Sequence, residues 1–192
     1  MKKNLPRKFY ERDTAKVARE LLGKVLIRPS KDGLTSGKIV ETEAYYGNDD
    51  PASRASKKKT KINQIMWEQG GLALVYMVHA NWLFNVTTEG KETPGAVLIR
   101  ALEPLKGLDI MKKRRERKNF QDLTSGPGKL TQALNISKKH YGLDLVNSEN
   151  IFISNFHKDE DLEIEKSHRI GVTKDLDREL RFYVAGNKCV SC

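Results

Sequence analysis

The chain has 192 residues, enough for one domain with a substantial core or at most two small ones. Its 38% hydrophobic and 31% charged residues are typical of a soluble globular protein, and its longest apolar stretch, residues 72–78, is far shorter than the roughly 20 residues of a transmembrane helix. The basic first residues lack the apolar segment of a signal peptide, so we expect a cytoplasmic protein that does not bind membranes. The 35 Lys and Arg against 25 Asp and Glu give a net charge of +10, which favours a polyanionic partner, above all nucleic acid, without identifying one.

The N-terminal part is predicted to form a capped helix over residues 14–22. Asp13 can accept hydrogen bonds from the first free amides of this helix, and its apolar residues share one face. Gly23 suits the left-handed residue that commonly follows a helix.

Two strands and a long loop are expected next. Residues 24–28 contain a β-like apolar run and lead into a turn at residues 31–33, after which residues 37–46 form the second strand. Residues 47–64 combine turn-forming residues with four lysines among residues 57–61, which indicates a long, exposed, cationic loop.

The second half of the chain alternates apolar and basic segments. Residues 72–78 and 95–102 are apolar and β-like with turn signals between them, so they are expected to pair with each other. Residues 108–118 are predicted to form a very basic helix, and the Ser-Gly-Pro-Gly sequence at residues 125–128 begins another. Residues 180–184 are again strand-like.

The whole pattern predicts a single α+β domain over residues 1–192, since it contains no internal repeat, low-complexity segment or clear linker. The two cysteines, Cys189 and Cys192, have CxxC spacing, but a structural zinc site normally has four ligands and no second cysteine pair exists. His157 and His168 could complete such a site in principle. Two incidental thiols are the simpler interpretation, and we expect no metal.

Candidate catalytic residues lie in the strand over residues 37–46. Alternate residues of a strand point to one face, so Glu41, Glu43 and Tyr45 bring two carboxylates and an aromatic ring together beside the cationic loop. Glu43 could act there as a general base next to a ring that stacks on a planar substrate. A solvated strand edge with ordinary surface acids explains the same pattern.

Three further residues stand out within or beside apolar runs. Tyr76 lies inside residues 72–78, and His79 follows that run, where a polar residue ending a strand is the simplest interpretation. Arg100 interrupts an apolar run, where an unpaired charge is costly. It either bridges a structural carboxylate, such as Glu103 or Glu41, or it faces a cleft and holds an anion or a water.

These segments, in this order, resemble the 3-methyladenine DNA glycosylases of the alkyladenine type. The shared segments span nearly the whole chain: residues 18–24, 41–45, 60–67, 100–104, 125–130 and 181–184. The resemblance implies a compact domain with a curved antiparallel sheet, surrounding helices and a positively charged face that binds DNA.

The resemblance also implies roles for individual residues. Glu43 matches the general base that activates the water attacking the anomeric carbon. Arg100 matches the arginine that helps to hold this water, with the main-chain carbonyl of Ile170 as the third partner. Tyr45 and Tyr76 match the aromatic walls that sandwich the flipped base.

Asn85 matches the asparagine that keeps guanine out by a clash with its exocyclic amine.

Two other positions depart from the family. Arg54 stands where the family has a histidine that hydrogen-bonds the flipped base. An arginine cannot accept a hydrogen bond, which puts the recognition of neutral lesions in question and predicts repulsion of a cationic base unless Arg54 turns to phosphate. His79 aligns with the tyrosine that fills the gap left by the flipped nucleotide, in a segment one residue shorter than the family's.

Physical chemistry fits these roles. Chemistry on a stacked base requires its extrusion at a cost of a few kcal/mol, and stacking on aromatic rings returns about 1–3 kcal/mol per base. The glycosidic bond breaks through an oxocarbenium-like sugar, which a carboxylate can stabilise while it deprotonates water. An alkylated purine is already cationic and leaves easily.

We therefore expect a monomeric, monofunctional DNA-repair glycosylase that needs no cofactor or metal and is associated with the nucleoid if the source is prokaryotic. It would release 3-methyladenine, 7-methylguanine and, by extension, hypoxanthine from double-stranded DNA and leave an abasic site. Lys57, Lys58, Lys59 and Lys61 are predicted to contact the DNA backbone. For residues 112–118, phosphate contacts and a solvated basic helix face are both open. The alternatives are a bifunctional glycosylase/lyase that uses a lysine Schiff base and a non-catalytic nucleic-acid-binding module that kept the fold.

Overall fold

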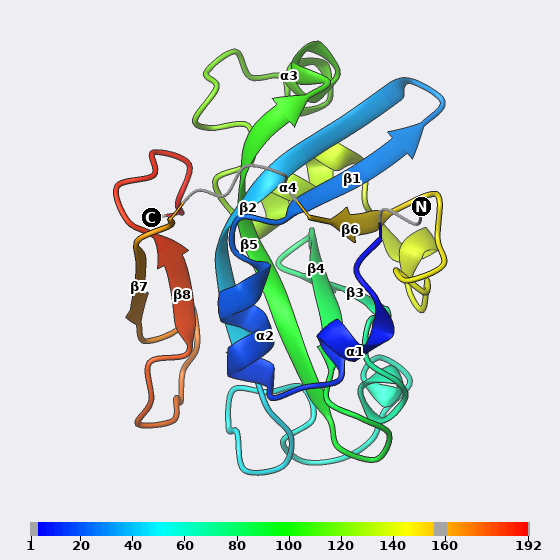
Figure 1. Ribbon diagram of the computed structural model, residues 1–192, viewed down its shortest axis with the longest axis vertical. Coiled ribbons are helices and arrows are strands. Elements are labelled where there is room, and N and C mark those ends of the chain that lie inside the picture. Colours follow the sequence, from blue (N-terminus) through cyan, green and yellow to red (C-terminus); the bar gives the residue numbers. More distant parts are fainter. Residues whose placement is uncertain (1–3, 156–160, 192) are drawn as a thin grey trace.

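Eight antiparallel strands form one curved sheet in the computed structural model, which describes residues 4–155 and 161–191 (Figure 1). The strand order is β3-β4-β5-β2-β1-β6, and β8 pairs with both β2 and β7. The strands are β1 (Val25–Ser30), β2 (Gly33–Tyr45), β3 (Ala73–Val78), β4 (Asn81–Thr88), β5 (Gly95–Lys106), β6 (Phe152–Ser154), β7 (Ile164–Ser167) and β8 (Arg181–Val184). The helices are α1 (Arg7–Tyr10), α2 (Thr14–Leu21), α3 (Leu108–Arg115), α4 (Pro127–Leu134) and the short 3-10 turns η1 (Gln64–Trp67) and η2 (Lys138–His140). The expected α+β class with a curved antiparallel sheet is confirmed.

Strand β2 is the centre of the sheet. β5 pairs along one of its edges, while β1 and β8 pair with successive parts of the other edge. The register of β2 against β5 shifts on both sides of Glu41, which indicates β-bulges there. A bulge bends its strand and changes the direction of the neighbouring side chains, and such features are common next to active sites.

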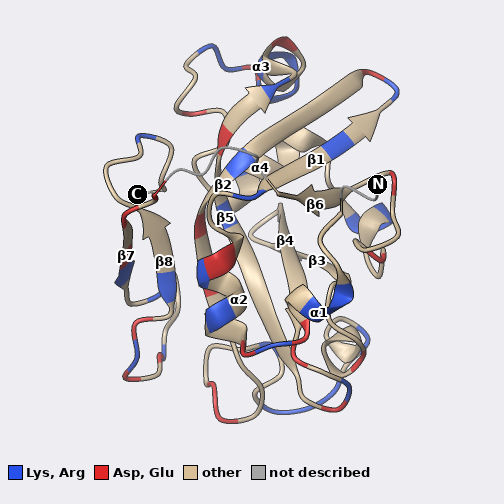
Figure 2. Cartoon of the chain, in the orientation of Figure 1, with Lys and Arg blue, Asp and Glu red and all other residues tan. Residues whose placement is uncertain are grey.

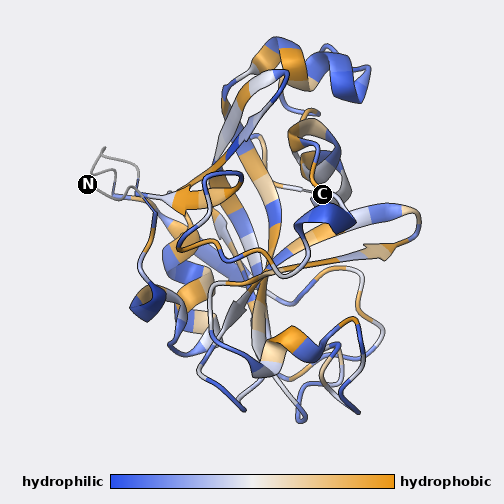
Figure 3. Ribbon diagram, turned by 90° about the vertical axis from the view of Figure 1, so that its right-hand side faces the viewer, coloured by the Kyte–Doolittle hydropathy of each residue, from blue (hydrophilic) through white to orange (hydrophobic). Residues whose placement is uncertain are grey.

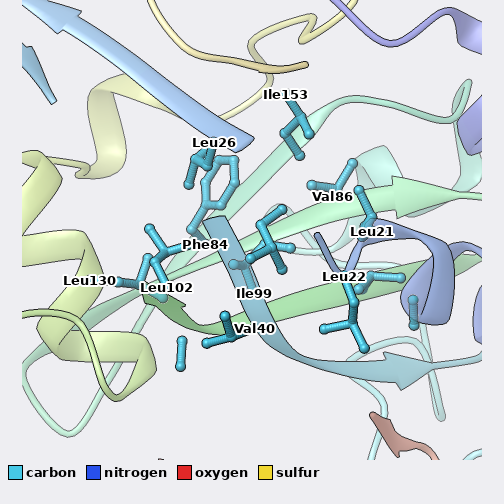
Figure 4. Packing of buried hydrophobic residues seen from close by; sticks show 14 of the residues in the cluster. Leu21, Leu22, Leu26, Val40, Phe84, Val86, Ile99, Leu102, Leu130 and Ile153 are labelled. Carbon is cyan, nitrogen blue, oxygen red and sulfur yellow. The ribbon is translucent and has the colours of Figure 1, made fainter. Parts of the chain in front are cut away.

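The hydrophobic core lies on the face of β2 that carries Val40 and Ala44, and α2 and α4 pack against the sheet there. Figure 4 shows Leu21 of α2 and Leu130 of α4 on opposite sides of a cluster that includes Val40, Phe84 and Ile99. The hydroxyl of Thr42 donates to the carbonyl of Ala18 in α2 (2.9 Å), which fixes this helix on the core face. Residues 41, 43 and 45 therefore point away from the core. Figure 3 shows hydrophobic residues interspersed with hydrophilic ones along the strands and helices, and mainly hydrophilic residues in the connecting loops.

Both predicted caps of the first long helix are present. The carboxylate of Asp13 accepts from the amide of Lys16 (2.9 Å), and Gly23 has φ +80°. The second predicted helix is α4, whose buried residues include Leu130, Ala133 and Leu134. The basic helix α3 ends at Arg115 rather than at residue 118, because Glu116 adopts a left-handed backbone with φ +52°.

One expected strand pairing in the middle of the chain is wrong. Residues 72–78 do not pair with residues 95–102, because β4 lies between them and pairs with both β3 and β5. The turn before β4 is formed by His79 and Ala80 with φ +46° and +61°, and neither residue is a usual signal for such a turn.

The long loop over residues 47–63 is also less exposed than expected. Its lysines are exposed, but Asp50, Ser53, Ala55 and Asn63 are buried. The side chain of Asn63 donates to the carbonyl oxygens of Arg54 (2.6 Å) and Lys58 (2.9 Å). These contacts give the loop a defined shape.

Figure 2 shows Lys and Arg gathered in the loop between β2 and β3 and around α3, at opposite ends of the molecule in this view. Within the part of the chain that the structure describes, no helix is long and apolar enough to cross a membrane.

Candidate active site

A cavity of about 320 Å³ opens on the face of the sheet opposite the core, and several of the predicted site residues line it. This volume is at the lower end for ligand pockets, which range over about 300–1,000 Å³. The cavity is lined by residues of β2 to β5, of the two loops on either side and of the start of α4: Tyr45, Ala52, Ser53, Arg54, Tyr76, Val78, Leu83, Leu98, Arg100, Pro127, Ile170, Gly171 and Val172. Hollows of about 440–500 Å³ elsewhere on the described surface contain none of the predicted site residues.

Glu43 lies behind this lining with no exposed surface. One carboxylate oxygen accepts from the main-chain N–H of Ile170 (2.7 Å), and the other accepts from the hydroxyl of Tyr45 (2.8 Å) and from Arg100 (3.3 Å). A carboxylate has about four acceptor positions, so roughly one is left for a water. Burial raises the pKa of Glu43, and the charge of Arg100 and the Ile170 N–H offset only part of this rise. A raised pKa makes the carboxylate a stronger base, as general-base catalysis near neutral pH requires.

Arg100 combines both roles that its sequence position allowed. Its Nε donates to Glu41 (2.9 Å), its second guanidinium nitrogen donates to Glu43 (3.3 Å), and it also lines the cavity. Burial alone would lower the pKa of Arg100, but the charges of Glu43 and Glu41 outweigh burial and raise it. The alternative of a solvated strand edge is wrong for β2, because Glu41 and Glu43 are fully buried in a central strand.

Tyr45 and Tyr76 both line the cavity, from β2 and β3. The guanidinium of Arg54 lies over the Tyr76 ring, 4.8 Å from its centroid. Burial raises the pKa of Tyr76, while the charge of Arg54 and hydrogen bonds with Arg54 and Asn85 oppose that rise. Arg54 therefore occupies the space in front of an aromatic wall, as a stacked base would.

The remaining predicted residues surround this centre. Asn85 is buried in β4 beside Tyr76, and its amide donates to the carbonyl of Leu74 (3.1 Å). His79 is exposed at the tip of the β3–β4 hairpin, just beyond Val78 in the cavity wall. Ile170 donates its main-chain N–H to Glu43, whereas the predicted role of this residue lies with its carbonyl.

The four lysines of the loop lie on the exposed surface that continues from Arg54. Lys57, Lys58, Lys59 and Lys61 are all exposed. The ammonium group of Lys59 lies 5.6 Å from the centroid of the Trp67 ring. The loop therefore presents positive charge close to the cavity.

A buried arginine, which was not predicted, joins the two loops that flank the cavity. Arg169 has a fully buried side chain that donates to both carboxylate oxygens of Asp50 (2.6 and 2.7 Å), to the carbonyl of Ala44 (2.9 Å) and to Asp175 (2.9 Å). Its guanidinium also lies over the Tyr45 ring, 4.6 Å from the centroid. Asp50 and Arg169 are 119 positions apart, and the residues around either one give no signal of this contact.

Of three other residues behind the site, one was predicted to share a face with Glu43 and to be a possible partner of Arg100, one was predicted to lie in a strand, and one was not singled out. They are Glu41, Arg181 and Ser191, which form one hydrogen-bonded group with Arg100. Among residues 4–155 and 161–191, no three His, Cys, Asp or Glu side chains lie close enough to hold a metal ion. Cys189 is buried, whereas His157 and Cys192 lie outside the described residues.

The chain is similar in sequence to known DNA glycosylases. The family model described as "Methylpurine-DNA glycosylase (MPG)" matches residues 8–188. A "Putative 3-methyladenine DNA glycosylase" of Carboxydothermus hydrogenoformans is 45% identical to the chain over 188 residues, covering 97% of this chain and 98% of the relative. A protein of the same name from Bacillus licheniformis is 42% identical over 191 residues, covering 97% of this chain and 96% of the relative.

Proposed function

The chain belongs to the methylpurine-DNA glycosylase family, and we propose that it flips alkylated purines out of duplex DNA and hydrolyses their N-glycosidic bond with a water activated by Glu43. The observation that carries this proposal is the buried Glu43 carboxylate, whose pKa is raised and which Arg100, Tyr45 and Ile170 hold directly behind a base-sized cavity. We expect the protein to act as a monomer in the cytoplasm.

The reaction follows from this arrangement. The electron pair of the C–N bond leaves with the purine, which becomes neutral if the lesion was cationic, and positive charge develops on the sugar. The Glu43 carboxylate stabilises that charge and takes a proton from the water whose oxygen attacks the anomeric carbon. Arg100, with one guanidinium nitrogen 3.3 Å from Glu43, holds the water beside the carboxylate, together with the carbonyl of Ile170. The products are a free base and an abasic site.

The cavity walls would bind the extruded base. Tyr45 and Tyr76 supply aromatic surface, and stacking on such rings returns part of the few kcal/mol that extrusion costs. Arg54 covers the Tyr76 ring, so a base that stacks on this side displaces the guanidinium towards the DNA backbone. Asn85, buried beside Tyr76, would disfavour guanine by a clash with its exocyclic amine. 7-Methylguanine carries the same amine but offsets this cost because the cationic base leaves easily.

DNA would approach across the hairpin tip and the loop. His79 projects from the tip of the β3–β4 hairpin, where a flat ring can fill the gap left by a flipped nucleotide. The hairpin is braced from behind, since the hydroxyl of Thr131 in α4 donates to the carbonyl of Trp82 (2.8 Å). The exposed lysines at residues 57–61 would contact phosphates on one side of the cavity mouth.

The decisive experiment is single-turnover base release from duplex oligonucleotides that each carry one lesion: a 3-methyladenine analogue, 7-methylguanine or hypoxanthine. Release that leaves alkali-labile abasic sites is the expected result, with the cationic 7-methylguanine leaving faster than neutral hypoxanthine. Arg54→His is the matched variant for specificity, because it restores an acceptor, and it should improve hypoxanthine release relative to 7-methylguanine. Intact binding without release from any lesion would favour the non-catalytic module, and trapping of the protein on DNA by borohydride would favour the lyase.

A further inference from the structure

Glu41 is a buried charge that the reaction described above does not use. Its side chain is fully buried and does not line the cavity. One oxygen accepts from Arg100 (2.9 Å), from Arg181 (2.7 Å) and from the hydroxyl of Ser191 (2.8 Å), and the other accepts from the Ser191 N–H (2.7 Å). Burying a carboxylate is costly unless all of its acceptor positions are paired. A buried and fully paired Glu41 therefore indicates a role in the fold or in the site.

The partners of Glu41 come from three separate parts of the fold. Arg100 belongs to β5, Arg181 to β8, and Ser191 to the C-terminal segment, which lies beside β8 in Figure 1. Ser191 also accepts from Arg100 through its hydroxyl (3.2 Å) and from Arg181 through its carbonyl (3.3 Å). The register of β2 and β8 places Arg181 opposite Glu43, immediately beside the catalytic group.

The two arginines pair differently with the two carboxylates: Arg181 binds Glu41, and Arg100 binds both Glu41 and Glu43. Glu41 and Glu43 carry two negative charges, which Arg100 and Arg181 balance within one buried cluster. Because Arg181 and Ser191 satisfy much of Glu41, one guanidinium nitrogen of Arg100 remains directed at Glu43. Without this support, Arg100 would be the only cation shared by both carboxylates.

We propose that Glu41 is a positioning residue for the glycosidic hydrolysis, which Arg181 and Ser191 hold in place and which in turn fixes Arg100 against Glu43. This inference rests on the proposed function, since it assigns a purpose to the surroundings of the same catalytic pair. Under this proposal, strand β8 and the C-terminal segment help to position Arg100 and Glu43 for the reaction.

The proposal predicts pH shifts of opposite sign for two variants. Glu41→Gln removes a negative charge beside Glu43, so the Glu43 carboxylate ionises at lower pH. Arg181→Gln removes a positive charge and leaves the Glu41 carboxylate more dependent on Arg100, so Glu43 ionises at higher pH. The charged and titratable groups that surround Glu43 from the neighbouring elements are Glu41 and Tyr45 of β2, Tyr76 of β3, Arg100 of β5, Arg169 behind Tyr45, and Arg181 of β8.

The test is the pH dependence of single-turnover release from a 7-methylguanine duplex. This base is already cationic and needs no proton to leave, so the acidic limb reports the ionisation of Glu43. We expect the midpoint to move down by about one pH unit in Glu41→Gln and up by about one pH unit in Arg181→Gln. A shift of this size is expected when one charge is removed from the same buried cluster as Glu43. Glu103→Gln, in which the lost charge faces Lys38 (3.2 Å) away from the cavity, and Arg178→Gln should leave the midpoint unchanged.

A further variant keeps all charges, so it tests the proposal even if the charge variants fail to fold. Ser191→Ala removes only the hydroxyl that links Glu41 to Arg100, and we expect the plateau rate to fall about fivefold with unchanged affinity for lesion DNA. Shifts of the same sign in both charge variants, or the absence of any shift, would overturn the proposal. If the charge variants do not fold, a plateau rate in Ser191→Ala equal to that of the wild type would overturn it. Failure of the wild-type protein to release any base would instead overturn the proposed function.

Discussion

The ion pair between Arg169 and Asp50 should determine both the stability of the protein and the shape of the cavity. Both side chains are fully buried, and the pair joins the loop that carries Arg54 to the segment that carries Ile170. The perturbation is Asp50→Asn, which keeps the shape of the side chain and removes its charge. The matched control is Asp49→Asn, since Asp49 is the exposed neighbour in the same loop.

The magnitude follows from the hydrogen bonds of Arg169. An arginine has five N–H donors, and here all five have partners: two on Asp50, one on Ala44 and two on Asp175. Removing one partner of a buried ion pair costs about 3–5 kcal/mol, because a buried charge is left unpaired. Asp175 remains in Asp50→Asn, so we expect the low end, about 3 kcal/mol, which lowers the melting temperature of a chain of this size by about 6–12 °C.

Urea denaturation of the wild type, Asp50→Asn, Arg169→Met and the double variant measures these free energies of unfolding. The double variant should lose less stability than the sum of the two single variants, because it no longer holds an unpaired charge. Asp49→Asn should stay within about 0.5 kcal/mol of the wild type. An Asp50→Asn variant as stable as this control, or strict additivity in the double variant, would refute the reasoning.

Three further outcomes are expected. Because burial raises the pKa of Glu43, base release should rise with pH through a midpoint above about 4.3, the ordinary value for glutamate, and a midpoint at or below that value in a pH–rate profile would contradict this. His79→Ala should slow release about tenfold from a paired lesion and much less from a mismatched one, whose base costs less to extrude, and equal losses in the two duplexes would exclude a wedge. Replacing Lys57 and Lys58 by Gln should reduce the salt dependence of DNA binding by about 0.9 in log–log slope for each lost phosphate contact, whereas Lys16→Gln, in α2 on the opposite face, should leave the slope unchanged.

Much of the site follows from the alternation of side chains along one strand. This alternation predicts that Glu43 and Tyr45 share a face, and the hydrogen bond between them (2.8 Å) confirms it. Whether that strand lies at an edge or at the centre depends on the pairing of β5 and β8, which are distant in sequence. The burial of Glu43, which raises its pKa, could therefore not be deduced from the residues around it.

Other features depend on contacts that leave little local signal. The strand β4 was missed because its turn uses His79 and Ala80 in left-handed conformations instead of glycine or asparagine. The partners Arg169 and Asp50 are 119 positions apart, and Glu41 and Ser191 are 150 positions apart. Each of these residues looks like an ordinary surface residue until the fold brings it to its partner.

The central claim is that Glu43 activates the water that cleaves the glycosidic bond, and Glu43→Gln tests it most directly. The variant keeps the side chain's size and an oxygen that can accept from Arg100, but it cannot take a proton from water. Single-turnover release from a 7-methylguanine duplex should fall by at least about 100-fold, within the range for loss of a general base, while the affinity for lesion DNA is retained. Release at a rate close to that of the wild type, with binding intact, would contradict the account.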